Sequence, residues 1–202
     1  MRNSFEEALH FRHACKVFDA HKKIPKDDLR FILESARMSP SSMGMEAWKF
    51  LVIQDGALKK ALAQTCWNPT KTEDCSEVIV LLNKKNIRST HPHVINQFKS
   101  RADNIEPFLK TYGNFIDSRS DDEISCWTGK QVYLASGFLM MSAASIRIDS
   151  CPIEGFDKEK ATEVLEIDIE NWDISYMIAL GYRVNEQQQR FRRDFDDVVE
   201  FI

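Results

Sequence analysis

The stretch Ile124–Ile146, ISCWTGKQVYLASGFLMMSAASI, and the segment Pro152–Asp157, PIEGFD, decide the fold of this chain of 202 residues. The first stretch is apolar on nearly every side of a helix, because bulky residues such as Val132, Tyr133 and Leu134 follow one another and cannot share one stripe. A helix of this kind that is not a membrane span belongs in a protein core or at a subunit interface. We therefore expect it to organise the fold around it.

Periodicity and turn residues predict the remaining elements on either side of this helix. Helices are expected at 4–13 (capped by Asn3 or Ser4), from Pro25 to the stop at Ser39-Pro40, at 57–65, from the cap at Ser120 to 146, and at 157–165. Strands are expected at 48–54, 78–82 and 175–180. The stretch 84–120 is ambiguous: 96–108 has a helical pattern, and Gly113 and Asn114 are expected to break it. Helices and strands mix without strict β-α-β alternation, so the predicted class is α+β, in one domain over 1–202.

Composition excludes several functions. A net charge of -4 argues against a nucleic-acid surface, which needs a basic excess. Five cysteines without a CxxC pair favour free thiols in a reducing cytoplasm. We expect no metal site, because His91-Pro92-His93 lacks a third ligand nearby, and no GxGxxG dinucleotide loop is present. No apolar run reaches membrane-spanning length and no signal pattern opens the chain, so a cytoplasmic protein is expected.

Five polar motifs carry the chemical information. They are Arg12-His13-Ala14-Cys15-Lys16, Ser39-Pro40-Ser41-Ser42 followed by Trp48, Asn68-Pro69-Thr70-Lys71, Pro152-Ile153-Glu154-Gly155, and Arg190-Phe191-Arg192. In this order and at these distances, the motifs resemble those of the FMN-dependent nitroreductase family. The resemblance spans almost the whole chain, so it bears on the fold as well as on the site.

The resemblance implies a fold and a reaction. The fold is an α+β nitroreductase-like one, with a mixed, mainly antiparallel sheet flanked by helices and a C-terminal tail exchanged with a partner subunit. The expected enzyme is a homodimer with FMN at the subunit interface and NADH or NADPH as electron donor. It would reduce nitroaromatic, quinone or related small-molecule acceptors by ping-pong hydride transfer through the flavin. The alternatives are a relative that reduces a pteridine, an enone or free flavin, and a non-redox flavin binder.

For the FMN phosphate, the resemblance assigns Arg12, Arg190 and Arg192. The planar guanidinium matches phosphate oxygens two at a time, and such charge-assisted bonds are strong. By residue type alone, arginines near a terminus are more often solvated surface charges. His13 and Ala14 are also expected at the cofactor. Ala14 is a departure, since the family commonly places a phosphate-binding serine there.

For the flavin ring, the resemblance assigns Lys16, Asn68 and Lys71. The spacing of Arg12 and Lys16 returns both side chains to one side in helix or strand. Lys16 and Lys71 would stabilise negative charge near N1 and O2, and Asn68 would hydrogen-bond the pyrimidine rim. Read by itself, Asn-Pro-x-Lys is an ordinary surface turn.

The segment Pro152–Gly155 is the most specific motif. In the family, Pro152 and Ile153 would lie against one ring face, while backbone amides at Glu154 and Gly155 would point to N5 and O4. Lys16, Lys71 and Glu154 are the expected catalytic residues. The alternative is a strand-to-helix turn with Asp157 as N-cap, and both readings are compatible.

The loop Pro40-Ser41-Ser42 is expected on the ribityl-phosphate side of the cofactor. The family usually follows it with Gln-Pro-Trp, but this chain has Glu46-Ala47-Trp48. The Trp is kept, whereas Glu46 and Ala47 put one family contact in doubt.

Overall fold

The computed structural model describes residues 5–202. Its helices are α1 (Phe5–Phe11), α2 (Lys26–Arg37), α3 (Gly56–Ala63), α4 (Thr70–Asp74), α5 (Pro92–Lys99), α6 (Glu106–Ile116), α7 (Asp121–Ser145) and α8 (Lys158–Val164). Its strands are β1 (Trp48–Ile53), β2 (Glu77–Lys84), β3 (Asp149–Ile153) and β4 (Trp172–Gly181). Two short 3-10 turns, η1 (Ser42–Gly44) and η2 (Phe195–Asp197), complete the description.

The four strands form one sheet in the order β1-β2-β4-β3, and all three pairings are antiparallel. The central strand β2 is buried on both faces, with Val78 to Leu82 at most 2% exposed. This explains its continuous apolar run, because a strand covered on both faces has no polar side. The predicted α+β class is confirmed.

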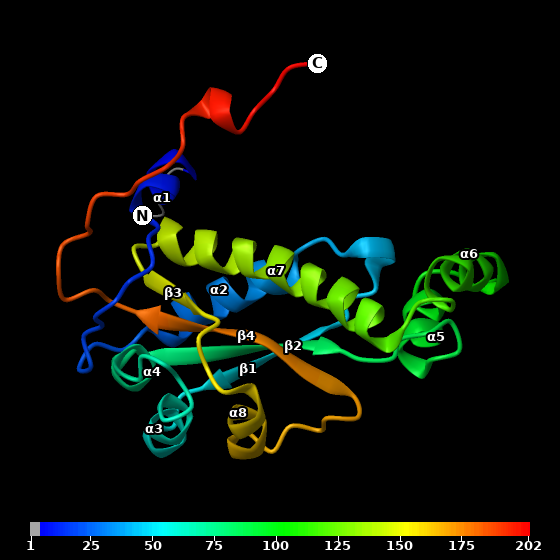
Figure 1. Cartoon of the computed structure of the whole chain (residues 1–202), viewed down its shortest axis with the longest axis horizontal. Coiled ribbons are helices and arrows are strands. Elements are labelled where there is room, and N and C mark those ends of the chain that lie inside the picture. Colours follow the sequence, from blue (N-terminus) through cyan, green and yellow to red (C-terminus); the bar gives the residue numbers. More distant parts are fainter. Residues whose placement is uncertain (1–4) are drawn as a thin grey trace.

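Helices cover both faces of the sheet, as Figure 1 shows. On one face α7 and α2 pack on a core that includes Ile32, Val132 and Leu139. On the other, α3, α4 and α8 enclose a second core that includes Leu62 and Cys151. The sheet therefore lies between two helical layers.

The predicted starts of two helices are confirmed by their caps. The Ser120 side chain accepts a bond from the Glu123 amide, and the Glu123 side chain accepts one from the Ser120 amide, which forms a capping box at the start of α7. The Asp157 side chain accepts a bond from the Lys160 amide and caps α8. The proposed caps Asn3 and Ser4 of the first helix lie outside the described residues.

The prediction of one helix at 96–108 is wrong. The structure has two helices there, α5 beginning at Pro92 and α6 with Pro107 in its first turn, separated by residues 100–105. Gly113 lies inside α6 and does not break it. A Cβ at this glycine would lie 2.8 Å from the Asp117 carboxylate and 3.3 Å from Ser89, so the glycine lets these two side chains approach the helix closely.

Together α5, α6 and the start of α7 enclose a third core with Met45, Tyr112 and Ile124. They lie at one end of the sheet in Figure 1. Two other elements differ from expectation: residues 70–74 form a short helix, α4, and 149–153 form the edge strand β3. Pro152 obscured this strand in the sequence, but an edge strand tolerates a residue without an amide donor.

After β4 the chain runs past α1 and then away from the body (Figure 1). This tail carries strongly exposed apolar side chains, including Phe191, Phe195 and Phe201 at 82%, 61% and 86%. Within residues 5–202, no helix is both long and apolar enough to cross a membrane.

Candidate functional site

The opening motif lies along the edge strand β3. Ala14 forms a parallel bridge with Ser150, and the Cys15 amide donates to the Ser150 carbonyl at 3.1 Å. Buried Asp149, on the same strand, binds the Arg183 guanidinium at 2.6 Å. Residues 12–16 are therefore fixed against β3 near the exit of β4.

His13 lies beside the Asp149–Arg183 ion pair but forms no hydrogen bond with it through Nδ1. Its Nδ1 is 3.5 Å from the Asp149 carboxylate but has no hydrogen-bond partner among the described residues. Burial, followed by the positive charge of Arg183, lowers the pKa of His13 below its usual value of 6.5. A neutral imidazole is therefore favoured near neutral pH.

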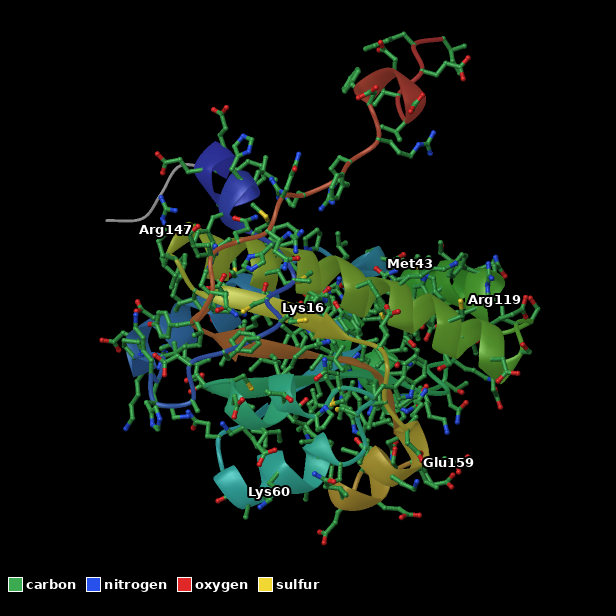
Figure 2. The ribbon with its side chains drawn as sticks, turned by 60° about the vertical axis from the view of Figure 1, so that its left-hand side comes forward. Lys16, Met43, Lys60, Arg119, Arg147 and Glu159 are labelled. Carbon is green, nitrogen blue, oxygen red and sulfur yellow. The ribbon has the colours of Figure 1, made fainter. Side chains whose placement is uncertain are left out.

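The charges of three cations reach the buried thiol of Cys151. Burial raises the pKa of Cys151, whereas the charges of Lys71, Lys16 and Arg12 act in the opposite direction. The structure thus brings Lys71, on α4, within electrostatic reach of the same residue of β3 as Arg12 and Lys16. Figure 2 shows Lys16 beside this strand. Asn68 is exposed just before α4.

An arginine cluster joins the two ends of the chain. The Arg190 guanidinium donates to the carbonyls of Leu9 at 2.5 Å and Arg12 at 2.9 Å. Burial lowers the pKa of Arg12, and the charges of Arg190 and Arg192 lower it further. Within residues 5–202 none of these three arginines pairs with a carboxylate. The cluster is therefore suited to an anion.

A cavity of about 270 Å³ opens beside this cluster. Its walls come from the opening motif and from the start of the tail, and include His13, Lys16, Arg183 and Arg190. Residues near the two ends of the chain therefore line one cavity within a single subunit.

The turn after β3 leaves backbone donors free. The Trp67 amide donates to the Gly155 carbonyl at 2.8 Å, and the Asp157 amide donates to the Thr65 carbonyl at 2.7 Å. The amides of Glu154 and Gly155, by contrast, donate to no acceptor among residues 5–202. The Tyr133 hydroxyl donates to the Glu154 carboxylate at 2.6 Å and holds the turn against α7.

Pro152 and Ile153 differ in exposure. Pro152 is half-buried, whereas Ile153 is 5% exposed and packs in the core below the sheet. Neighbouring side chains of a strand point to opposite faces. The expectation that Ile153 offers its side chain to a flat ring needs correction: only its backbone is available on the side of Pro152.

Trp67 is a residue that the sequence reasoning missed. A Cβ at Gly155 would lie 2.7 Å from the Trp67 ring, so the two residues are in close contact, yet Trp67 is 85% exposed. Trp67 therefore offers an aromatic face to solvent beside the free amides of Glu154 and Gly155. Its place directly before Asn68 was the available signal.

The loop Pro40-Ser41-Ser42 lies elsewhere. The Ser42 amide donates to the side chain of Gln131 on α7 at 2.8 Å. Gln131 and Tyr133 are two residues apart and so point about 200° away from each other around the helix. Because Tyr133 contacts Glu154, the loop and the turn lie on opposite sides of α7. In Figure 2, the labelled Met43 and Lys16 accordingly lie on either side of the α7 ribbon.

Comparisons with known proteins identify the family of this chain. The model of the Nitroreductase family matches residues 9–182. A Staphylococcus aureus protein named "Putative NAD(P)H nitroreductase" is 38% identical over 216 aligned positions, which cover 100% of this chain and 97% of that protein. A Staphylococcus haemolyticus protein with the same description is 36% identical, over 100% and 99%.

Solved structures show the same fold. A nitroreductase-like structure from Exiguobacterium sibiricum, described as a complex with FMN, superposes with a TM-score of 0.86 at 21% identity, covering 99% and 98% of the two chains. A structure from Staphylococcus epidermidis, described as an NAD(P)H:FMN oxidoreductase, gives 0.82 at 23% identity, covering 100% and 98%.

Proposed function

The chain belongs to the nitroreductase family, and from this premise we propose that it is an FMN-dependent NAD(P)H oxidoreductase that reduces nitroaromatic, quinone or related electron-poor acceptors. The observation that carries the proposal is the meeting of unpaired arginines, two lysines and free backbone amides along one edge of β3. FMN needs groups of these kinds, namely cations for its phosphate and donors for the edge of its ring. The relatives named as NAD(P)H nitroreductases support the same reaction class.

The arginine cluster fits the phosphate of FMN. Arg12, Arg190 and Arg192 repel one another, and no carboxylate of the described residues relieves that repulsion. A phosphate dianion would do so and would accept several charge-assisted hydrogen bonds. We assign these three side chains to phosphate binding.

The turn after β3 fits the reactive edge of the flavin ring. The free amides of Glu154 and Gly155 supply two donors, and glycine at 155 lets the backbone approach closely. Lys16 and Lys71 add a positive field on the same side of the strand. Bound FMN would accept hydride from NADH or NADPH and pass it to the acceptor. The protein's part is to hold the ring, orient these donors and stabilise negative charge.

Trp67 and Tyr133 border the same turn from two sides. Tyr133 stacks on Tyr176, with ring centroids 4.4 Å apart, and its hydroxyl fixes Glu154. Trp67 presents a nearly free aromatic face next to Gly155. Flat aromatic groups prefer such offset contacts. We assign Trp67 to the wall against which nicotinamide and acceptor rest in turn.

A homodimer would complete the site. The Ser41–Ser42 loop contacts α7 on the side opposite the Glu154 turn, and we infer that the loop and the turn of one copy face different ligands. Tyr133, Leu134 and Phe138 leave 46%, 44% and 44% of their area exposed on α7, an apolar surface suited to a second copy. We assign α7 to the dimer interface, with the loop of one subunit facing the β3 edge of the other. The exposed tail would then wrap the partner.

Purified protein tests the proposal directly. We expect it to carry FMN, with the absorption of oxidised flavin, and to oxidise NADH or NADPH faster when a nitrofuran or a quinone is added. A panel with an enone, a pteridine and free flavin would identify a different acceptor. Flavin-loaded protein without NAD(P)H turnover on any acceptor would indicate a non-redox binder, and protein that binds no FMN would contradict the proposal.

A further inference from the structure

The helix α5 presents a row of polar side chains to one neighbouring loop. His93 and Gln97 are one turn apart and so share a face. The His93 Nε2–H donates to the Met45 carbonyl at 2.6 Å, and the Gln97 amide donates to the same oxygen at 3.3 Å. Burial lowers the pKa of His93, so it contacts this carbonyl as a neutral donor near neutral pH.

Arg101 continues the row just beyond the end of α5. Its guanidinium donates to the carbonyls of Met43 and Gly44, both at 3.0 Å. A third bond, from Nε to the Gln97 carbonyl at 2.8 Å, fixes the side chain to its own helix. Three successive carbonyls of the loop, 43 to 45, are therefore held by one helix face.

The loop that receives these bonds has an unfavourable backbone. Met43 and Glu46 have φ values of 54° and 46°, in the left-handed region that residues other than glycine seldom adopt. Gly44, at φ 63°, is so close to Arg101 that a Cβ there would lie 2.1 Å from the guanidinium. Such a conformation persists only where surrounding contacts enforce it, and α5 supplies those contacts.

The same loop determines the direction of two serines. The Ser41 hydroxyl accepts a bond from the Glu46 amide at 2.9 Å, so its position depends on the strained residue. Ser42 begins η1, directly before Met43. Both serines are only partly buried, and Arg101 and Met43 are exposed. The bonds of Arg101 therefore support a surface feature rather than the core.

We propose that Arg101 is a positioning residue for the cofactor: with His93 and Gln97 it holds residues 41–46 in the shape in which Ser41 and Ser42 meet the flavin of the neighbouring subunit. This rests on the proposed function. It makes α5 a part of the cofactor site although the helix itself does not touch β3.

The test compares three variants of the full chain. Arg101→Gln removes the guanidinium and its charge. Arg101→Lys keeps the charge but cannot donate to the two carbonyls in the same way. Lys99→Gln, the control, removes an exposed charge on α5. We expect Arg101→Gln to raise the FMN dissociation constant at least fivefold and Arg101→Lys by an intermediate factor, while Lys99→Gln stays at the parental value. The melting temperature of the flavin-free protein and its hydrodynamic size are measured alongside. At full FMN loading, reduction of Lys99→Gln by NAD(P)H should keep the parental rate.

A parental FMN dissociation constant in a folded Arg101→Gln or Arg101→Lys protein would overturn the inference. Unfolding or loss of the parental hydrodynamic size in Arg101→Lys would also overturn it, because Arg101 would then support the fold. Failure of the parental protein to bind FMN would instead refute the proposed function, which keeps the two outcomes distinct.

Discussion

Single residues set the electrostatics of the β3 edge. Arg192 and Arg193 are neighbours on the exposed tail, but only Arg192 is close enough to affect Arg12. Arg193 instead bonds to the carbonyl of Asp197 at 2.5 Å. This pair therefore offers a matched comparison of one arginine inside the cluster with one outside it.

We predict that Arg192→Gln weakens FMN binding about tenfold, the typical effect of losing one charge-assisted hydrogen bond at a partly exposed site. Arg193→Gln should leave affinity unchanged. Fluorescence titration of flavin-free protein with FMN measures both. Equal affinities for the two variants would refute the assignment of Arg192 to the phosphate.

A second residue-scale prediction concerns the charge near the flavin ring. Lys16→Met should retain bound FMN but slow its reduction by NAD(P)H, on the order of tenfold or more, because a fixed positive charge that stabilises the reduced ring is lost. Lys22→Met is the control, since Lys22 lies over the Tyr182 ring instead. Stopped-flow absorbance measures the rate. Parental reduction in Lys16→Met would show that Lys16 has no such role.

Residue identity and spacing predicted part of this site. Arg12 and Lys16, four residues apart, both act electrostatically on Cys151, because their segment pairs with β3 at Ala14. Trp67 was missed because only tertiary contact reveals that its ring covers Gly155. Likewise Lys59, a polar position of a surface helix by pattern, is 4% exposed and donates to the Cys75 carbonyl at 2.6 Å.

At the scale of elements, α7 has two different sides. One is buried against the sheet, and the other leaves Tyr133, Leu134 and Phe138 in solvent. The sequence indicated apolar character on every side and predicted a core or interface helix. The structure shows which residues face the core, and the rest form the surface that we assign to the dimer.

We predict that Phe138→Glu gives a monomer that loses FMN, since a charge buried in an apolar interface is strongly unfavourable. Ile169→Glu is the matched control, because Ile169 is 57% exposed between α8 and β4, outside the proposed interface. Analytical ultracentrifugation and flavin absorbance report the two properties. A dimeric Phe138→Glu protein that keeps its FMN would place the interface elsewhere.

Capping residues in the sequence correctly predicted where two helices begin. The capping box at Ser120 and the cap at Asp157 define the starts of α7 and α8 without tertiary help. The region from 84 to 120 could not be predicted in this way. Its helices α5 and α6 are short and are stabilised by packing around Tyr112, which a helical pattern spread over 96–108 does not reveal.

At the scale of the whole molecule, three histidines make stability depend on pH. Burial is the largest cause in each case and lowers the pKa of His13, His91 and His93 below the usual 6.5. As pH falls through 6.5, the unfolded chain takes up protons at these positions before the folded chain does. The free energy of unfolding should therefore decrease between about pH 7 and pH 5.

His93→Gln should make this decrease smaller, because one group that must stay neutral is removed. Urea unfolding of the flavin-free protein at several pH values measures it. An identical slope in His93→Gln and the parent would show that His93 does not contribute.

The whole-molecule arrangement of the site was beyond the sequence. The motifs gave the order of the cofactor-binding segments along the chain but not their places in space. Only the structure shows that α7 separates Ser41 and Ser42 from the β3 edge, because the side chains of Gln131 and Tyr133 point in opposite directions. From this separation we draw the central proposal, that each FMN is bound by two copies of the chain.

Complementation between two defective variants tests this claim most directly. Arg12→Ala damages the β3 edge, and Ser42→Glu damages the loop by placing a carboxylate near the phosphate side. Each homodimer should bind FMN poorly. In a heterodimer isolated with two different affinity tags, one site combines an intact β3 edge with an intact loop, so we predict one tightly bound FMN per heterodimer. A heterodimer that binds no FMN better than either parent variant would contradict the claim, because the two halves would then belong to a single chain.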